Sequence, residues 1–92
     1  MGRDTVNWRD EILKCMSIHE DSPNTIIDAA PSWGSGLYDV EFDSGYGGNE
    51  GIPFAVWTYQ RVYFPACYDG AEWVESVPRY PDGQPIKHIG GG

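Results

Sequence analysis

Two cysteines and two histidines are the side chains of this sequence best suited to metal binding or nucleophilic catalysis. Cys15 and His19 are four positions apart, which places a thiol and an imidazole about one turn apart on a helix. Together with Cys67 and His88 they could form a zinc site, but no second closely spaced pair accompanies them. Neither cysteine lies in a recognisable catalytic motif or at an expected helix N-terminus that would lower its pKa. We therefore predict no enzyme, no metal site and no cofactor.

The two cysteines leave a choice between a disulfide and free thiols. The first residues, Met1–Val6, lack the apolar segment of a secretory signal. Without export, a reducing cytosol favours thiols over a Cys15–Cys67 bridge. We expect a cytoplasmic protein with free thiols.

A row of carboxylates is the second pattern that could do chemistry. Asp39, Glu41 and Asp43 alternate with the apolar residues Tyr38, Val40 and Phe42. This period of two residues is that of a β-strand. Alternate strand residues are about 6.8 Å apart, close to the spacing of backbone phosphates in nucleic acid. Such a row could enter a cationic protein cleft that normally holds nucleic acid. The alternative is the solvated outer face of a surface strand.

Further acids and aromatic residues complete the partner-binding surface that we expect. The additional acids lie in the neighbouring loop and hairpin: Glu50, Asp69, Glu72 and Glu75. Tyr46 lies in a glycine-rich loop where nothing local would bury it, and Trp33 lies in a Pro/Ser/Gly-rich segment. Tyr and Trp are frequent interface anchors, so we assign both to partner binding. Trp57, Trp73 and Phe64 are expected to pack in the core and strands instead.

Length and charge limit the classes of protein to consider. The chain has 92 residues, enough for one domain, and six Lys+Arg against fourteen Asp+Glu give a net charge of −8. This charge argues against direct binding of nucleic acid. An aromatic content of 14% argues against intrinsic disorder, and no apolar stretch is long enough to span a membrane.

The first expected element is an amphipathic helix. Asn7 is a suitable N-cap, and Asp10 completes a capping box at the third helical position. One face of the helix carries apolar and thiol side chains at helical spacing: Trp8, Ile12, Cys15, Met16 and His19. Pro23 ends the element.

Four strands are expected after the helix, at residues 38–43, 54–59, 61–68 and 72–77. Asp69-Gly70 is a two-residue hairpin signal that sets Phe64 opposite Glu75. Pro65 cannot donate to a ladder, so a bulge or an edge position is expected there. The segment 24–30 could be a short strand or a helical turn. The predicted fold class is α+β: an N-terminal helix packed on an antiparallel meander of about four strands, in a single domain of residues 1–80. Residues 81–92 are expected to form an extended, partly mobile tail.

The strand sequences resemble those of small phage- and prophage-encoded domains. The resemblance covers residues 51–83, through Gly51-Ile-Pro-Phe-Ala-Val-Trp-Thr, Arg61-Val-Tyr-Phe and Tyr68-Asp-Gly-Ala-Glu-Trp. In size, acidity and aromatic content the whole chain is similar to anti-CRISPR proteins, small phage inhibitors of diverse fold. Several of those occupy the nucleic-acid-reading surfaces of Cascade or Cas nucleases. No family motif matches residue by residue, so no functional residue is transferred.

The resemblance and the carboxylates together predict a non-enzymatic inhibitor that acts as a partial DNA mimic. Its partner would be a basic surface of a host defence complex, such as Cascade or a Cas nuclease, in the bacterial cytoplasm. No direct contact with nucleic acid or membrane is expected, and the protein would be a monomer or a small homo-oligomer. The alternative is a small phage structural or adaptor domain that binds a protein through surface aromatics.

Overall fold

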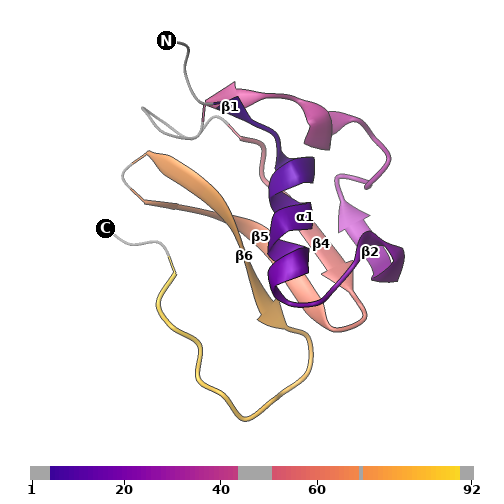
Figure 1. The fold of residues 1–92 in the computed structure, drawn as a ribbon, viewed down its shortest axis with the longest axis vertical. Helices are drawn as coiled ribbons and strands as arrows, with labels where there is room; N and C mark the ends of the chain where they lie inside the picture. The colour runs from indigo at the N-terminus through magenta and orange to yellow at the C-terminus, as the bar shows by residue number, and fades with distance from the viewer. Residues whose placement is uncertain (1–4, 44–50, 69, 90–92) are drawn as a thin grey trace.

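The computed structural model describes residues 5–43, 51–68 and 70–89. Within these residues it has one α-helix, two short 3₁₀ turns and six strands (Figure 1). The helix is α1 (Trp8–Ile18), and the 3₁₀ turns are η1 (Pro23–Thr25) and η2 (Leu37–Asp39). The strands are β1 (Thr5–Val6), β2 (Ile26–Ala30), β3 (Phe42–Asp43), β4 (Ala55–Thr58), β5 (Arg61–Tyr68) and β6 (Ala71–Pro78).

The helix α1 begins and ends where the sequence predicts. The Asn7 side chain accepts a hydrogen bond from the backbone N–H of Asp10, and Asp10 and Glu11 supply negative charge in the first turn. The buried residues of the helix are Trp8, Ile12, Cys15 and Met16. His19 is the C-cap and is exposed, so the predicted apolar face stops one turn earlier than its spacing suggests.

The main sheet is antiparallel, with strand order β2-β4-β5-β6, and a second sheet pairs β1 with β3. The predicted α+β class, with a helix and a four-stranded antiparallel meander, is therefore confirmed. Its first strand is β2, however, because residues 38–43 do not form the predicted strand. Only Phe42 and Asp43 are paired in a strand, whereas Leu37–Asp39 form η2.

The β5–β6 hairpin has the register that the Asp69-Gly70 turn predicts. Phe64 pairs with Glu75, and the ladder is continuous from Arg61 to Tyr68 without the bulge considered at Pro65. The pairing of β4 with β5 extends only as far as Tyr63, so Pro65 lies beyond it. Its missing N–H therefore breaks no ladder bond.

The ambiguous segment 24–30 contains both of the structures considered for it. The 3₁₀ turn η1 begins with Pro23, and Ser22 caps it by accepting a hydrogen bond from the N–H of Asn24. The strand β2 follows and pairs with β4, with an irregularity between Ile26 and Asp28. Local composition did not separate the two because the strand depends on β4 for its ladder bonds.

The hydrophobic core lies between α1 and one face of the main sheet. Trp8 is 1% exposed, and its ring lies against Phe42 and Phe54 with centroids 4.7 and 5.0 Å away. Its indole N–H donates to the carbonyl of Ile52 at 2.9 Å. A Cβ at Gly51 would approach the Trp8 ring to 2.6 Å, so only glycine fits this contact.

After β6 the chain carries no further helix or strand in the described residues up to 89. It turns and runs back beside β6 (Figure 1). Among the described residues, no helix is both long and apolar enough to cross a membrane.

Candidate functional site

The predicted row of carboxylates is not arranged along one exposed strand face. Gly36 has a φ of +88°, and this left-handed residue turns the chain into η2, which places Tyr38 in the core and Asp39 at the surface. Asp43 is only 4% exposed, and Val40 is 58% exposed. The inward and outward positions therefore do not follow the strict alternation that the sequence suggests.

Asp39 and Trp33 belong to a compact cluster with Arg9. The Arg9 guanidinium donates from Nε to the Asp39 carboxylate at 2.6 Å and from Nη2 to the Trp33 carbonyl at 2.8 Å. Its carbon Cζ lies 4.4 Å from the centroid of the Trp33 ring. Trp33 also packs against Tyr38, so it is half-buried and not the free surface anchor predicted from its loop. Burial raises the pKa of Tyr38, with Arg9 acting in the opposite direction.

The other acids of the expected surface have varied surroundings. Glu41 accepts a hydrogen bond from the Thr5 hydroxyl at 2.8 Å. Glu72 accepts from the backbone N–H of Gly51, and Glu75 accepts from the indole N–H of Trp73 at 2.7 Å. Tyr46, Glu50 and Asp69 lie outside the described residues, so their predicted role in partner binding is not located.

The thiols and imidazoles do not come together as a site. Cys15 is buried and Cys67 is exposed, and both are free. Burial raises the pKa of Cys15, which opposes the thiolate that a nucleophile needs. Partial desolvation of the largely exposed His19 imidazole, together with the nearby charge of Arg61, lowers its pKa. In the part of the chain that the structure describes, no group of three or more His, Cys, Asp or Glu could hold a metal ion.

A polar cluster around Asp21 joins the end of α1 to the sheet. Its carboxylate accepts hydrogen bonds from the hydroxyls of Thr25, Thr58 and Tyr63 at 2.7, 2.7 and 2.8 Å. Burial on its own would raise the pKa of Asp21, but these bonds and one from Ser22 N–H outweigh it and lower the pKa to about 2. Because every partner belongs to the fold, this cluster serves structure. Sequence reasoning did not identify it.

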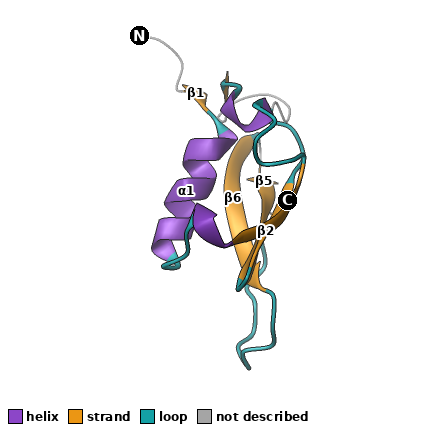
Figure 2. Cartoon of the chain, turned by 90° about the vertical axis from the view of Figure 1, so that its right-hand side faces the viewer, coloured by secondary structure: helices purple, strands orange, loops and turns teal. Residues whose placement is uncertain are grey.

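The main sheet has two faces with different surroundings. The buried residues of the covered face, which lies toward α1, are Val56, Thr58, Tyr63, Val74 and Ser76. The side chains between them point to the opposite side because strand residues alternate. We call that side the open face; its residues are Asp28, Ala30, Ala55, Trp57, Val62, Phe64, Ala66, Trp73, Glu75 and Val77. Figure 2 shows α1 on one side of the sheet only.

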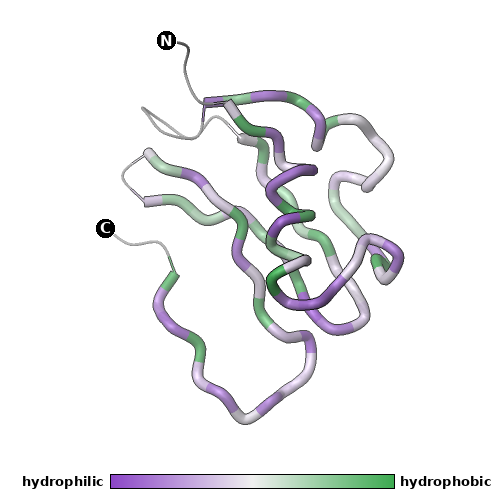
Figure 3. The backbone as a smooth tube through the Cα atoms, in the orientation of Figure 1, coloured by the Kyte–Doolittle hydropathy of each residue, from purple (hydrophilic) through white to green (hydrophobic). Residues whose placement is uncertain are grey.

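The open face is apolar without being part of the core. Trp57, Phe64 and Trp73 are each partly exposed, and none belongs to the core cluster or to the side chains packed against it. Their predicted place in the core is therefore wrong, although their place in strands is right. Hydrophobic colour appears along the strands of the main sheet as well as on α1 (Figure 3). An antiparallel sheet with one solvated face normally shows polar residues there.

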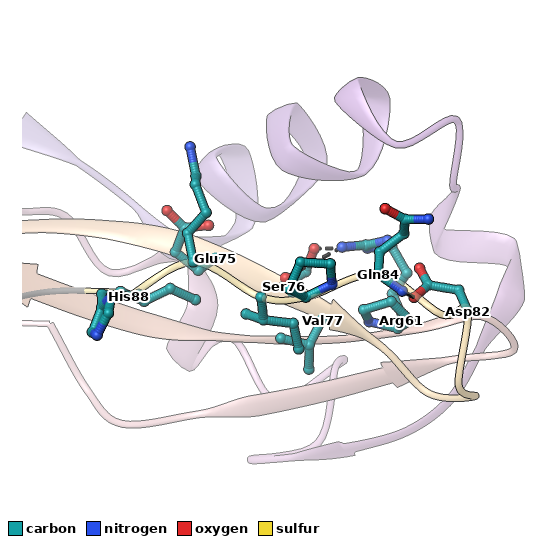
Figure 4. A pocket seen from close by; sticks show the side chains of 12 residues that line it. Arg61, Glu75, Ser76, Val77, Asp82, Gln84 and His88 are labelled. Atoms are coloured by element: carbon teal, nitrogen blue, oxygen red, sulfur yellow. Dashed lines mark hydrogen bonds between the residues drawn. The ribbon is translucent and has the colours of Figure 1, made fainter.

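A groove of about 260 Å³ lies beside the open face, between β6 and the returning C-terminal segment. Figure 4 shows Glu75 and Arg61 on its wall, with the Arg61 guanidinium directed to Ser76. Arg61 donates from Nε to the Ser76 hydroxyl at 2.8 Å and from Nη2 to its carbonyl at 3.2 Å. Arg61 is thus engaged within the fold, while the Glu75 carboxylate is bonded to Trp73.

The sequence contains a signal for the open face, but the same signal also fits packing in the core. In β5 every position after Arg61 is apolar or aromatic, a pattern expected when both faces of a strand avoid water. One helix of 11 residues cannot cover both faces of a four-stranded sheet, which leaves one of them open. Comparison with protein-family models, with curated proteins and with solved structures found no match.

Proposed function

We propose that this protein is a non-enzymatic binding module that holds a partner protein on the open face of its main sheet. The observation that carries this proposal is the group of three large aromatic side chains, Trp57, Phe64 and Trp73, outside the core of so small a domain. Exposed contiguous apolar surface on a small protein is a mark of an interaction site. Trp is also among the residues that contribute most binding energy at interfaces.

Charge favours protein over nucleic acid as the partner. Aromatic residues on a sheet can stack with bases, but such surfaces require surrounding positive charge. The chain has a net charge of −8, and the charged residues of the open face itself, Asp28 and Glu75, are acidic. A phosphate backbone would be repelled, whereas a basic protein surface would be attracted.

A narrower proposal identifies the partner as a CRISPR complex, which this protein would bind and inhibit. The net charge supports it, because a cationic nucleic-acid-handling surface would attract this protein. The carboxylate row contributes less than expected, since Asp43 is buried and Asp39 is neutralised by Arg9. In the inhibitor proposal, the acids of the open face, rather than the predicted carboxylate row, would contact the cationic surface of the partner.

The experiment is capture of partners from a bacterial host lysate by the wild type and by matched variants. The test variant is Trp57→Thr with Phe64→Thr, which removes two aromatics but keeps residues that favour strands. The control is Ile18→Thr with Val40→Thr, which changes two exposed apolar side chains elsewhere, 76% and 58% exposed. Loss of a captured protein only in the test variant supports the proposal. Equal capture by both variants contradicts it.

Salt dependence then tests the inhibitor version. Affinity for a captured Cascade or Cas nuclease should fall steeply between low and high ionic strength if a cationic cleft is the target. Removal of two charges by Asp39→Asn with Glu41→Gln should weaken that affinity no more than Glu20→Gln with Asp10→Asn does if the open face, and not the predicted row, makes the contact. A large loss in this variant would restore the carboxylate row as the interface.

A further inference from the structure

We propose that the open face recognises arginine side chains of its partner through two tryptophan–carboxylate pairs, Trp57 with Asp28 and Trp73 with Glu75. This inference rests on the proposed function and specifies the chemistry of the partner. Asp28 on β2 is the direct cross-strand neighbour of Trp57 on β4. Glu75 lies two residues after Trp73 on β6, and their side chains are hydrogen-bonded at 2.7 Å.

The same chain shows what a tryptophan and a carboxylate do when a guanidinium is available. Arg9 lies over the ring of Trp33 at 4.4 Å and pairs with Asp39 at 2.6 Å. The aromatic face attracts the cation through its quadrupole, while the carboxylate accepts its N–H groups. Trp57 with Asp28 and Trp73 with Glu75 present the first two components of this trio at the surface.

No guanidinium of the described residues completes either of these two pairs. Arg9 is bound to Asp39, Lys14 to Glu11, and Arg61 to Ser76. Arg79 donates to the carbonyls of Thr58 and Tyr59 and lies over the ring of Tyr80. Lys87 and His88 line the same groove as Glu75, but neither Asp28 nor Glu75 forms an ion pair with a described basic residue.

Arginine fits these pairs better than lysine. Its planar guanidinium stacks on an indole and still directs N–H groups sideways to a carboxylate, which the compact ammonium of lysine does less well. The guanidinium is also more weakly hydrated, so it loses less on entering a half-buried site. A second copy of this chain is a poor occupant, because two molecules that each carry a charge of −8 repel each other.

The spacing of the two pairs sets the spacing of the arginines. Trp57 on β4 is opposite Val62 of β5, and Trp73 on β6 is opposite Ala66 of β5. The two tryptophans are therefore separated by two strand spacings across the sheet and by four residues along the strand direction. With standard sheet spacings their Cα atoms are about 16 Å apart. An extended segment with two arginines about five residues apart would reach both.

The probe is a synthetic peptide, acetyl-Arg-Ser-Gly-Ser-Gly-Arg-amide, with a citrulline version that keeps the shape and removes both charges. Binding is followed by chemical shifts of the indole N–H groups, at low and at physiological salt. We expect shifts of Trp57 and Trp73 with the arginine peptide, and affinity at least about ten-fold weaker for citrulline. A lysine peptide should bind more weakly than the arginine peptide.

Two charge-matched variants separate a specific site from general attraction to an acidic protein. Asp28→Asn with Glu75→Gln should weaken arginine-peptide binding about ten-fold. Glu20→Gln with Asp10→Asn changes the net charge equally at exposed positions away from the open face and its groove, and should weaken it less than about two-fold.

Three outcomes would overturn arginine recognition. Equal losses in the two variants would show only general electrostatic attraction. Equal binding of the citrulline peptide would remove the role of the cation. A concentration-dependent dimer abolished by Trp57→Thr would assign the face to a second copy. If instead lysate capture still depends on Trp57 and Phe64, the binding module stands and only its preference for arginine is wrong.

Discussion

Both faces of the main sheet carry apolar side chains, but the two faces have different surroundings. On the covered face, Val56 and Tyr63 are fully buried beneath α1. On the open face, Trp57 and Phe64 occupy the neighbouring positions of the same strands and remain partly exposed. The difference shows that hydrophobicity along a strand does not determine burial; the available covering element does. We expect substitutions on the covered face to change stability and those on the open face to change binding.

The largest effect is expected from matched truncation of two tryptophans. Trp8→Ala removes the central ring of the core and should lower the free energy of unfolding by about 3–5 kcal/mol. Trp57→Ala should cost only about 1 kcal/mol, because the side chain is already partly in water. Urea unfolding followed by circular dichroism measures both. Similar losses in the two variants would mean that the open face is as much a part of the core as the covered one.

Disrupting the Asp21 cluster should cause the next largest loss in the free energy of unfolding, and this loss should depend on pH. Asp21→Asn leaves fewer acceptors for three hydroxyl donors, and at neutral pH it should cost about 2–3 kcal/mol. The pKa of Asp21 is lowered to about 2 in the fold, so the unfolded chain binds the proton more tightly. The stabilisation is therefore full above the unfolded pKa and is lost as the pH falls from about 4 to about 2. Because Asp21 is partly solvated, the pH-dependent part should be at most about 2 kcal/mol.

Unfolding curves at several pH values check this prediction. The difference in stability between the wild type and Asp21→Asn should shrink on acidification through that window. A difference that stays constant from pH 6 to pH 2 would show that the carboxylate charge does not contribute.

A smaller change in stability is expected when the same substitution, Val to Thr, is made on each of the two faces. Val56→Thr buries a hydroxyl beneath α1 and should cost about 1–3 kcal/mol. Val62→Thr, one strand away on the open face, should change stability by less than about 0.5 kcal/mol. Thermal unfolding of both variants is the measurement. A cost for Val62→Thr equal to that of Val56→Thr would show that the open face excludes water in the free protein.

The smallest effect concerns the cluster at the edge of the fold. Asp39→Ala removes a salt bridge whose carboxylate side chain is 57% exposed, and should cost less than about 1 kcal/mol. High salt should reduce the difference from the wild type further. A loss of stability above about 2 kcal/mol would indicate that the Arg9 guanidinium needs Asp39 to keep its position over the Trp33 ring.

Local sequence patterns predicted most of the regular structure. The Asn7 cap, the buried helix face and the β5–β6 register follow from rules that involve only neighbouring residues. The same rules failed at Tyr38–Asp43, where alternating polarity suggested a strand. There the left-handed Gly36 and the contact of Asp39 with Arg9, thirty residues earlier in the chain, favour a turn instead. A local pattern contains no information about such a distant partner.

The candidate site was less predictable than the fold. Asp28 did not enter the expected surface, and Trp57 and Trp73 were assigned to packing, because each becomes notable only beside its neighbour across or along the sheet. Glu72 and Glu75 are present as predicted acids, but each accepts a hydrogen bond within the fold. The Asp21 cluster likewise joins residues up to 42 positions apart, which no spacing rule would collect.

The sequence by itself determined the class of the fold, the helix and its cap, the hairpin register and the strong negative charge. These properties depend on short-range backbone preferences and on composition, which are written directly in the order of residues. Only the tertiary structure decided which face of the sheet α1 covers, which aromatic rings remain in contact with water and which carboxylates have an internal cation. Those outcomes depend on long-range packing, because a single short helix can shield only one side of four strands.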